Sequence, residues 1–274
     1  MSTFVTRTLT GVLYVAVMVF CTVYGAWTLG LLVTLLTLLA VRELLTICGP
    51  APRTLVSLGS LLFPLGVFLS FFTQTLSLPL LLTPYIAFIV FVFVRTLYQR
   101  TENPLTVLGT VALSQLYVVV PLSLLFVLAF GTAPAENNLP FWALPLVLYV
   151  FLWLNDSGAY LFGSLLGRHK LFPRISPGKT WEGSIGGGLV TVASSLLAYH
   201  FFPALALWQW MGMAAVTVLL GTWGDLTESL IKRTLGIKDS GHLLPGHGGI
   251  LDRIDSMLMA IPAVVVFLLV SGCF

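Results

Sequence analysis

Charged residues are scarce in this chain of 274 residues, in which Lys, Arg, Asp and Glu together make up 8%. A soluble globular domain carries about 25% charged residues. So few charges cannot cover a surface in water, and the 58% hydrophobic content indicates that the bilayer is the solvent. The net charge of +3 is too small to indicate a nucleic-acid partner. The composition therefore excludes a soluble enzyme and favours an integral membrane protein.

Cysteine is scarce as well. Cys21, Cys48 and Cys273 lie far apart and form no CxxC or Cys/His pattern, which excludes a disulfide framework and favours plain packing roles. His242 and His247 lie close together, but only carboxylates could complete a zinc site around them. We therefore expect no zinc. We interpret His247 as a phosphate or backbone partner, with flanking glycines that let the chain approach a ligand closely.

Long apolar runs are abundant. Between Arg7 and Arg42 lie 34 uncharged residues, about 51 Å as a single helix, whereas a bilayer core is about 30 Å thick. This length predicts two helices that turn near Gly25. Further spans are expected roughly over 55–72, 76–94, 105–129, 141–162, 184–202, 206–224 and 256–273. The sequence thus predicts an all-α, polytopic integral membrane protein with about nine transmembrane helices.

The placement of the basic residues predicts an orientation. With nine spans, all 13 Lys and Arg residues fall on alternate connections, and the opposite connections contain none. An error of one span would scatter these charges over both faces. Because basic residues are retained on the cytoplasmic side, the N-terminus is predicted to be cytoplasmic and Phe274 to face away. Arg42 and Glu43, at the basic end of the second span, are interpreted as an interfacial pair.

The charges gather in the second half of the chain. Of the 23 charged residues, 15 lie between Asp156 and Asp255. Acidic residues at or near membrane depth are costly and usually functional. The chain is therefore expected to divide by role into an N-terminal transmembrane scaffold of about five helices, residues 1–140, and a C-terminal catalytic transmembrane region, residues 141–274, with cytoplasmic loops at 163–183 and 232–253.

Residues 176–184 contain Gly-Lys-Thr, the tripeptide that ends the phosphate-binding loop of P-loop nucleotide hydrolases. That loop requires another glycine five residues before the first one of the tripeptide, where this chain has Pro173. It also requires a preceding β-strand, and the sequence shows no strand pattern there. A P-loop is therefore excluded.

The same stretch is still suited to bind phosphate. Ser176 is predicted to cap a helix that begins at Pro177. The first turn would present free backbone N–H groups and the positive end of the helix dipole. The residues in or near that turn are Lys179, Thr180 and Glu182. A basic juxtamembrane loop that touches lipid headgroups explains the stretch equally well, and the stretch alone does not decide between the two.

A second charged stretch covers residues 224–255. Asp225, Glu228, Ser229 and Lys232 recur at spacings of three, four and seven, so they share one face of a predicted helix. Such a face is suited to line a binding site. A solvated, salt-bridged face gives the same pattern and is the alternative.

Aspartates stand at both ends of the connection that follows. Asp225 is expected near the cytoplasmic end of its span, and a glycine-rich loop leads to Asp252, Arg253 and Asp255, which open the last span. Asp225 and Asp252 are suited to hold Mg²⁺ through oxygen ligands, with nucleotide phosphates completing the coordination shell. Lys and Arg around them would balance the remaining phosphate charge.

This stretch resembles the signature of the phosphatidate cytidylyltransferase family, also called CDP-diacylglycerol synthases. The resemblance is carried by Ser229, Lys232, Arg233, Lys238, Asp239, Pro245, His247, Gly248, Gly249, Asp252, Arg253 and Asp255. The upstream elements that match are Asn155 and Asp156, Ala159 and Tyr160, Ser176 and Pro177, and residues 179–183. The match covers roughly residues 150–256.

The resemblance implies an activity and a set of site residues. The activity is transfer of CMP from CTP to phosphatidate, which gives CDP-diacylglycerol and pyrophosphate, with Mg²⁺ as cofactor and a second cation left open. The family's metal aspartates correspond to Asp225 and Asp252, and the catalytic set adds Lys232 and Asp255. The substrate-binding set is Asp156, Ser176, Lys179, Thr180, Glu182, Glu228, Arg233, Lys238, Asp239, His247 and Arg253.

The resemblance also implies a cellular setting. It implies a homodimer among membrane lipids, in the inner (plasma) membrane of a bacterium, with a polar cavity and an active site that faces the cytoplasm. CTP would arrive from the basic side of the membrane and phosphatidate from the bilayer. No covalent enzyme intermediate is required, because the lipid phosphate can attack the α-phosphorus of CTP directly.

Two other functions fit parts of the pattern. A CTP-dependent polyprenol or phytol kinase also joins a nucleotide to a lipid, but the His-Gly-Gly and Asp-Arg-x-Asp elements argue against it. A secondary transporter could use Asp156, Asp225 and Asp252 as ion sites. Transporters often show two related halves, whereas this chain has an almost uncharged first half and no internal repeat. The products formed from labelled CTP would separate these functions.

Overall fold

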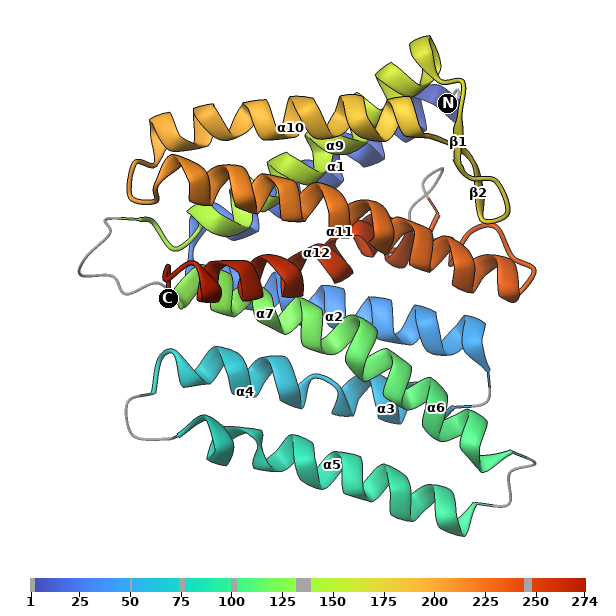
Figure 1. Cartoon of the computed structure of the whole chain (residues 1–274). Helices are drawn as coiled ribbons and strands as arrows, with labels where there is room; N and C mark the ends of the chain where they lie inside the picture. Colours follow the sequence, from blue (N-terminus) through green and yellow to red (C-terminus); the bar gives the residue numbers. More distant parts are fainter. Residues whose placement is uncertain (1–2, 50, 74–76, 100–102, 132–138, 244–247) are drawn as a thin grey trace. The chain divides into compact units, whose positions relative to one another are not determined.

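The computed structural model describes residues 3–49, 51–73, 77–99, 103–131, 139–243 and 248–274. Helices account for most of them, as Figure 1 shows. The helices of the first half are α1 (Thr3–Tyr24), α2 (Ala26–Cys48), α3 (Arg53–Gly59), α4 (Leu62–Ser70), α5 (Leu78–Tyr98), α6 (Pro104–Ser114), the π-helical turn η1 (Gln115–Val119) and α7 (Val120–Phe130). The second half contributes α9 (Ala143–Leu166), α10 (Trp181–Phe201), α11 (Leu207–Thr234) and α12 (Leu251–Val270).

Seven helical stretches of the described residues are long and apolar enough to cross a membrane. They are Ala26–Cys48, Arg53–Ser70, Leu78–Tyr98, Pro104–Phe130, Ala143–Leu166, Trp181–Phe201 and Leu251–Val270. The other two predicted spans fall on α1, whose apolar part Thr8–Tyr24 is shorter, and on α11, which is not among the helices apolar enough to cross. The membrane-protein fold class is therefore supported, while the count of nine stays a prediction.

The chain packs as two compact units. Unit 1 consists of Met1–Phe126 with Lys238–Arg253, and unit 2 of Val127–Ile237 with Ile254–Phe274. The first three residues of α12 therefore belong to unit 1 and the rest of that helix to unit 2. This division reflects packing, whereas the predicted division at residue 140 concerns roles, which packing does not test.

A short β-hairpin in unit 2 corrects the prediction of a purely α-helical chain. Strand β1 (Lys170–Phe172) pairs antiparallel with β2 (Ser176–Thr180), so that Lys170 lies opposite Thr180 and Phe172 opposite Ser176. Gly-Lys-Thr thus lies in a paired strand. The predicted helix start at Pro177 is wrong, because the backbone of this stretch is used for strand pairing, and proline is tolerated in an edge strand.

The cap of the following helix is Thr180 instead of Ser176. Helix α10 begins at Trp181, and the hydroxyl of Thr180 accepts a hydrogen bond from the N–H of Gly183 at 3.2 Å. The backbone of Thr180 is extended, with φ −127° and ψ 154°, as an N-cap residue requires. Sequence reasoning identified the right type of cap but placed it four residues too early.

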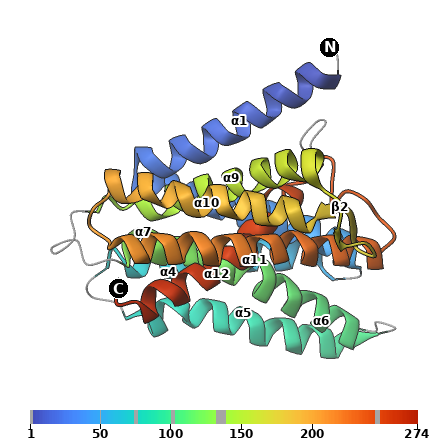
Figure 2. The same ribbon diagram turned by 45° about the horizontal axis from the view of Figure 1, so that its top comes forward.

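Glycines in unit 2 allow two helices to approach closely. Figures 1 and 2 both show α10 lying alongside α9 and α11. A Cβ on Gly158 of α9 would lie 2.8 Å from the Cα of Gly187 of α10, and a Cβ on Gly187 would lie 2.5 Å from the carbonyl oxygen of Asn155. Small residues at such crossings let backbones pack against each other where no hydrophobic effect drives helix association.

In unit 1, α2 is buried along one side almost to its end. Its buried residues are Leu29, Gly30, Leu32, Val33, Leu36, Thr37, Ala40, Val41, Leu44 and Leu45. Their recurrence every three to four residues is the pattern of a helix with one face in a core. Leu44 and Leu45 follow Glu43 directly, so that core packing holds the segment that carries this carboxylate.

We expect the substitution Gly187→Ala to destabilise unit 2, because the new Cβ would meet backbone atoms that cannot move aside. Gly109→Ala is the matched control: Gly109 also lies in a helix, α6, but a Cβ there meets nothing within 4 Å. Gly→Ala at an open helical position stabilises by about 0.5–1 kcal/mol. Thermal unfolding in detergent should show a lower midpoint for the first variant only; equal midpoints would contradict the close crossing.

Candidate active site

An ion pair joins the hairpin of unit 2 to α11. The Nζ atom of Lys179, at the end of β2, lies 2.7 Å from Oδ2 of Asp225. Both side chains are about a quarter exposed, at 25% and 29%. The hydroxyl of Ser229 donates to the other oxygen, Oδ1, of Asp225 at 3.3 Å. Two predicted site residues that are far apart in sequence are thus in contact, and both oxygens of Asp225 are engaged.

The predicted charged face of α11 is confirmed by two pairs of residues four positions apart. Ser229 binds Asp225, and Lys232 forms an ion pair with Oε2 of Glu228. The side chain of Glu228 is 0% exposed and that of Lys232 is 13% exposed, so this second pair is buried. Glu228 is therefore salt-bridged, as the alternative held, but it is not solvated. A buried carboxylate of this kind must be neutralised by its surroundings.

Helix α12 brings a further acid to this region of unit 2. A Cβ on Gly224 would lie 2.6 Å from the carbonyl oxygen of Asp255, so the two helices are in close contact beside Asp225. The carboxylate of Asp255 lies within electrostatic range of Asp225, Asp156 and Lys179. Its Oδ1 accepts a hydrogen bond from the N–H of Ser256 at 2.6 Å. Two predicted site acids, Asp156 of α9 and Asp225 of α11, therefore act on a third, Asp255 of α12.

The hairpin is fixed at both ends by predicted site residues. Arg233 of α11 donates from Nε to the carbonyl oxygen of Ile175 at 3.4 Å. The carboxylate of Glu182 accepts from the backbone N–H groups of Arg168 and His169 at 3.1–3.2 Å and lies 2.6 Å from Nδ1 of His169. These contacts give Glu182 and Arg233 roles in holding the hairpin that carries Lys179.

Unit 1 contains Asp252, in the first turn of α12. Its Oδ2 accepts hydrogen bonds from the N–H of Gly249 at 2.8 Å and from the N–H of Ser240 at 3.1 Å. The carboxylate is thus oriented by the backbone of the preceding loop. The predicted site residues Lys238, Asp239 and Arg253 are exposed. His247 lies outside the described residues.

Sequence reasoning missed Glu43 of α2 as part of this loop's structure. Its Oε2 accepts from the N–H of Ile250 at 2.8 Å, and its Oε1 accepts from the hydroxyl of Ser240. The interpretation of Glu43 as one half of an interfacial pair with Arg42 is therefore incomplete, because its carboxylate faces the loop. The rule that an acid near membrane depth is usually functional applied to Glu43 as much as to Asp225.

The donor chemistry of these residues fits Mg²⁺. Among the described residues, no group of three or more His, Cys, Asp and Glu side chains is arranged to hold a metal ion. Mg²⁺ in nucleotide enzymes is held by only one or two carboxylates, with phosphates and water completing six oxygen ligands. Asp225 is a partly exposed carboxylate of this kind, and its cationic partner in this structure is the ammonium of Lys179.

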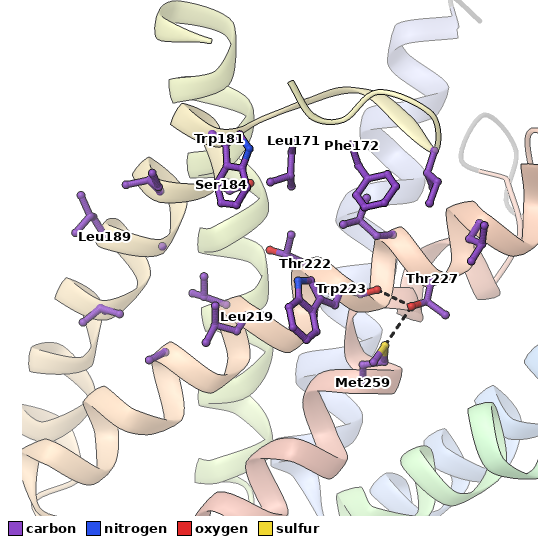
Figure 3. A pocket seen from close by; sticks show the side chains of 18 residues that line it. Leu171, Phe172, Trp181, Ser184, Leu189, Leu219, Thr222, Trp223, Thr227 and Met259 are labelled. Carbon is purple, nitrogen blue, oxygen red and sulfur yellow. Dashed lines mark hydrogen bonds between the residues drawn. The ribbon is translucent and has the colours of Figure 1, made fainter. Parts of the chain in front are cut away.

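A separate apolar cavity of about 930 Å³ lies in unit 2, between the hairpin, α10, α11 and Met259. Figure 3 shows Phe172, Trp181 and Trp223 around it, and the hydroxyl of Thr227 between the carbonyl oxygen of Trp223 and the sulfur of Met259. The α11 residues that line it are Ala215, Val218, Leu219, Thr222, Trp223, Leu226, Thr227 and Leu230. Val218 and Thr222 precede Asp225 by seven and three positions, so the face of α11 that lines the cavity adjoins the face that carries Asp225.

The chain belongs to the cytidylyltransferase family, whose model matches residues 5–271. A relative from Staphylococcus aureus named phosphatidate cytidylyltransferase is 48% identical over 128 residues, which is 46% of this chain and 49% of the relative. A relative of the same name from Haemophilus influenzae is 45% identical over 130 residues, 45% of each chain. The matched region thus spans about half the length of these curated relatives.

The two ion pairs of α11 predict unequal costs for the same substitution. Lys232→Met would leave the fully buried Glu228 without this partner, and we expect a loss of about 3–5 kcal/mol of unfolding free energy. Lys179→Met removes a partly exposed pair and should cost about 1 kcal/mol or less. Denaturant unfolding in detergent, followed by tryptophan fluorescence, measures both. Similar losses for the two variants would contradict the difference in burial.

Proposed function

We propose that this protein transfers CMP from CTP to phosphatidate, producing CDP-diacylglycerol and pyrophosphate. The observation that carries the proposal is the Lys179–Asp225 ion pair, which joins the two charged stretches of an otherwise apolar chain. Membership of the cytidylyltransferase family supports it, as do the names of the curated relatives. A water-soluble donor of CMP and a lipid acceptor both carry phosphates, so their reaction needs such a site, charged but embedded among apolar helices.

The reaction needs no covalent enzyme intermediate. An oxygen of the phosphatidate phosphate attacks the α-phosphorus of CTP, and the bond from that phosphorus to the bridging oxygen of the β-phosphate breaks. The electron pair leaves with pyrophosphate. The task of the protein is to hold two anionic phosphates together, and basic side chains can do so by balancing their charge. We assign this role to Lys179, Lys232, Arg233, Lys238 and Arg253, with Ser176, Thr180, His247, Asp156, Glu182, Glu228 and Asp239 completing the substrate-binding set.

We assign Mg²⁺ to Asp225 and Asp252, the two positions that carry the metal ligands in the family pattern, and place Asp255 with Lys232 in the catalytic set. Bound there, the ion would polarise the transferred phosphoryl group and neutralise the charge on the leaving pyrophosphate. Lys179 then has two functions, one after the other. It balances the charge of Asp225 before the substrates bind, and it lies beside the site when their phosphates arrive. A second cation is compatible with the number of acids in unit 2.

We propose nine membrane crossings, a cytoplasmic N-terminus and an active site open to cytoplasmic CTP, in the inner membrane of a bacterium. The one-sided distribution of the 13 basic residues supports this orientation. We further propose a homodimer, as the family resemblance implies.

The test of the activity uses the purified full-length chain in vesicles with phosphatidate, Mg²⁺ and CTP that carries its label either on the α-phosphate or on the γ-phosphate. We expect the α-label in a lipid and the γ-label in pyrophosphate. A CTP-dependent lipid kinase gives the reverse, with the γ-label in the lipid and the α-label in CDP. Either that result or no transfer at all would overturn the proposed reaction.

We expect Asp225→Asn and Asp252→Asn each to lower activity by about 100-fold or more, because amides keep the volume but lose the charge that holds the cation. The double variant should be little worse than either single one, since residues that act as a unit are not additive. Glu136→Gln, which changes a carboxylate that has no role in the proposal, is the control. Initial rates at saturating CTP measure the effect; most activity surviving in Asp252→Asn would move the metal to Asp255 or Glu228.

A further inference from the structure

Glu43 makes three hydrogen bonds to one loop of unit 1. Its Oε2 accepts from the backbone N–H of Ile250 at 2.8 Å and from that of Leu251 at 3.5 Å. Its Oε1 accepts from the hydroxyl of Ser240. Glu43 is separated from Ile250 by 207 positions in the sequence, so these are tertiary contacts between α2 and the segment before α12. A carboxylate with this many donors is a fixed part of the loop's structure.

The carboxylate of Glu43, which belongs to α2, lies where a capping group of α12 would lie. The first N–H groups of a helix have no partner within it. Leu251 is the first residue of α12, and its N–H and that of Ile250 point to Glu43. A negative charge at this end also interacts favourably with the helix dipole. Glu43 therefore helps to determine where α12 begins.

The glycines of the loop make room for this carboxylate. A Cβ on Gly249 would overlap Oε1 of Glu43, and a Cβ on Gly241 would lie 2.7 Å from the same atom. The sequence predicts that the glycines flanking His247 let the chain approach a ligand closely. At these two positions, the group that approaches the backbone is the side chain of Glu43. The glycines at these two positions thus have a reason that is independent of any substrate.

The same backbone holds Asp252. Ser240 donates its hydroxyl to Glu43 and its N–H to Oδ2 of Asp252. Gly249 donates its N–H to Asp252, and the next residue, Ile250, donates to Glu43. Two carboxylates from α2 and α12 are therefore joined through two short backbone segments. A shift of either segment would turn the carboxylate of Asp252.

We propose that Glu43 is a positioning residue, which holds Ser240 and the Gly249–Leu251 backbone so that Asp252 presents its carboxylate in one orientation. It acts through the loop and touches neither substrate nor cation. The inference rests on the proposed function only where activity and Mg²⁺ are measured. The structural part, that Glu43 orders the loop, stands independently of the reaction.

The first test measures the loop alone, by hydrogen–deuterium exchange of the detergent-solubilised chain without ligands. In Glu43→Ala, we expect faster exchange of the amides of Ile250 and Leu251 than in the wild type, with α10 unchanged. Glu43→Gln keeps the shape and one acceptor oxygen and should lie between the two. Arg42→Gln is the matched control, because Arg42 is the exposed neighbour on the same helix. Unchanged exchange in both Glu43 variants would overturn the proposal.

The second test measures the consequence for Asp252 by the rise in melting temperature that Mg²⁺ causes without substrates. Residues that orient metal ligands typically contribute about 10–100-fold to metal affinity or activity. We expect the Mg²⁺ concentration for half of the maximal rise to increase by about that factor in Glu43→Ala and less in Glu43→Gln. Adding Glu43→Ala to Asp252→Asn should leave this Mg²⁺ concentration the same as in Asp252→Asn alone. An additional effect in that double variant, or none in the single ones, would overturn the positioning role.

The activity assay separates this inference from the proposed function. If the wild type forms CDP-diacylglycerol, Glu43→Ala should lower kcat and raise the Mg²⁺ requirement by about 10–100-fold while the KM for CTP changes little. A change confined to the KM for CTP would contradict a role that acts through Asp252. If the wild type forms no liponucleotide, the proposed function fails, and the exchange experiment still decides whether Glu43 orders the loop.

Discussion

A carboxylate that is removed from water must be given a partner, and this requirement organises the polar part of the protein. Isolated buried charges are too costly to persist, so each one is paired or receives several hydrogen bonds. Only 23 charged residues are present in 274, and most of those in the described site region have identified partners. Their arrangement therefore follows from electrostatics as much as from packing.

The two units meet this requirement differently. In unit 2 the acids of α11 are balanced by lysines: Asp225 by Lys179 and Glu228 by Lys232. In unit 1, Glu43 and Asp252 are held by backbone N–H groups and a serine hydroxyl. Backbone donors fix a carboxylate in place without neutralising it, whereas a flexible lysine neutralises it and is able to change partner. Asp252 is therefore fixed in orientation, and Asp225 is paired with a cation that can move.

Glycine supports this arrangement in two separate ways. Where α9 meets α10 and α11 meets α12, a missing side chain lets helices pack close together without a hydrophobic driving force. Before α12, it lets the carboxylate of Glu43 lie against the backbone. The apolar cavity beside Trp223 is lined by the neighbouring face of α11. One helix thus presents an apolar surface and a charged site on adjoining faces.

The sequence alone determined the features that depend on neighbouring residues. The long apolar helices follow from apolar length. The face of α11 shared by Asp225, Ser229, Glu228 and Lys232 follows from helical spacing. Tertiary structure decided the rest. Strand pairing moved the cap to Thr180, and helix packing brought Lys179 to Asp225 and Glu43 to the loop before α12. Such contacts depend on chain paths over many residues, whereas hydropathy and helical period report only local geometry.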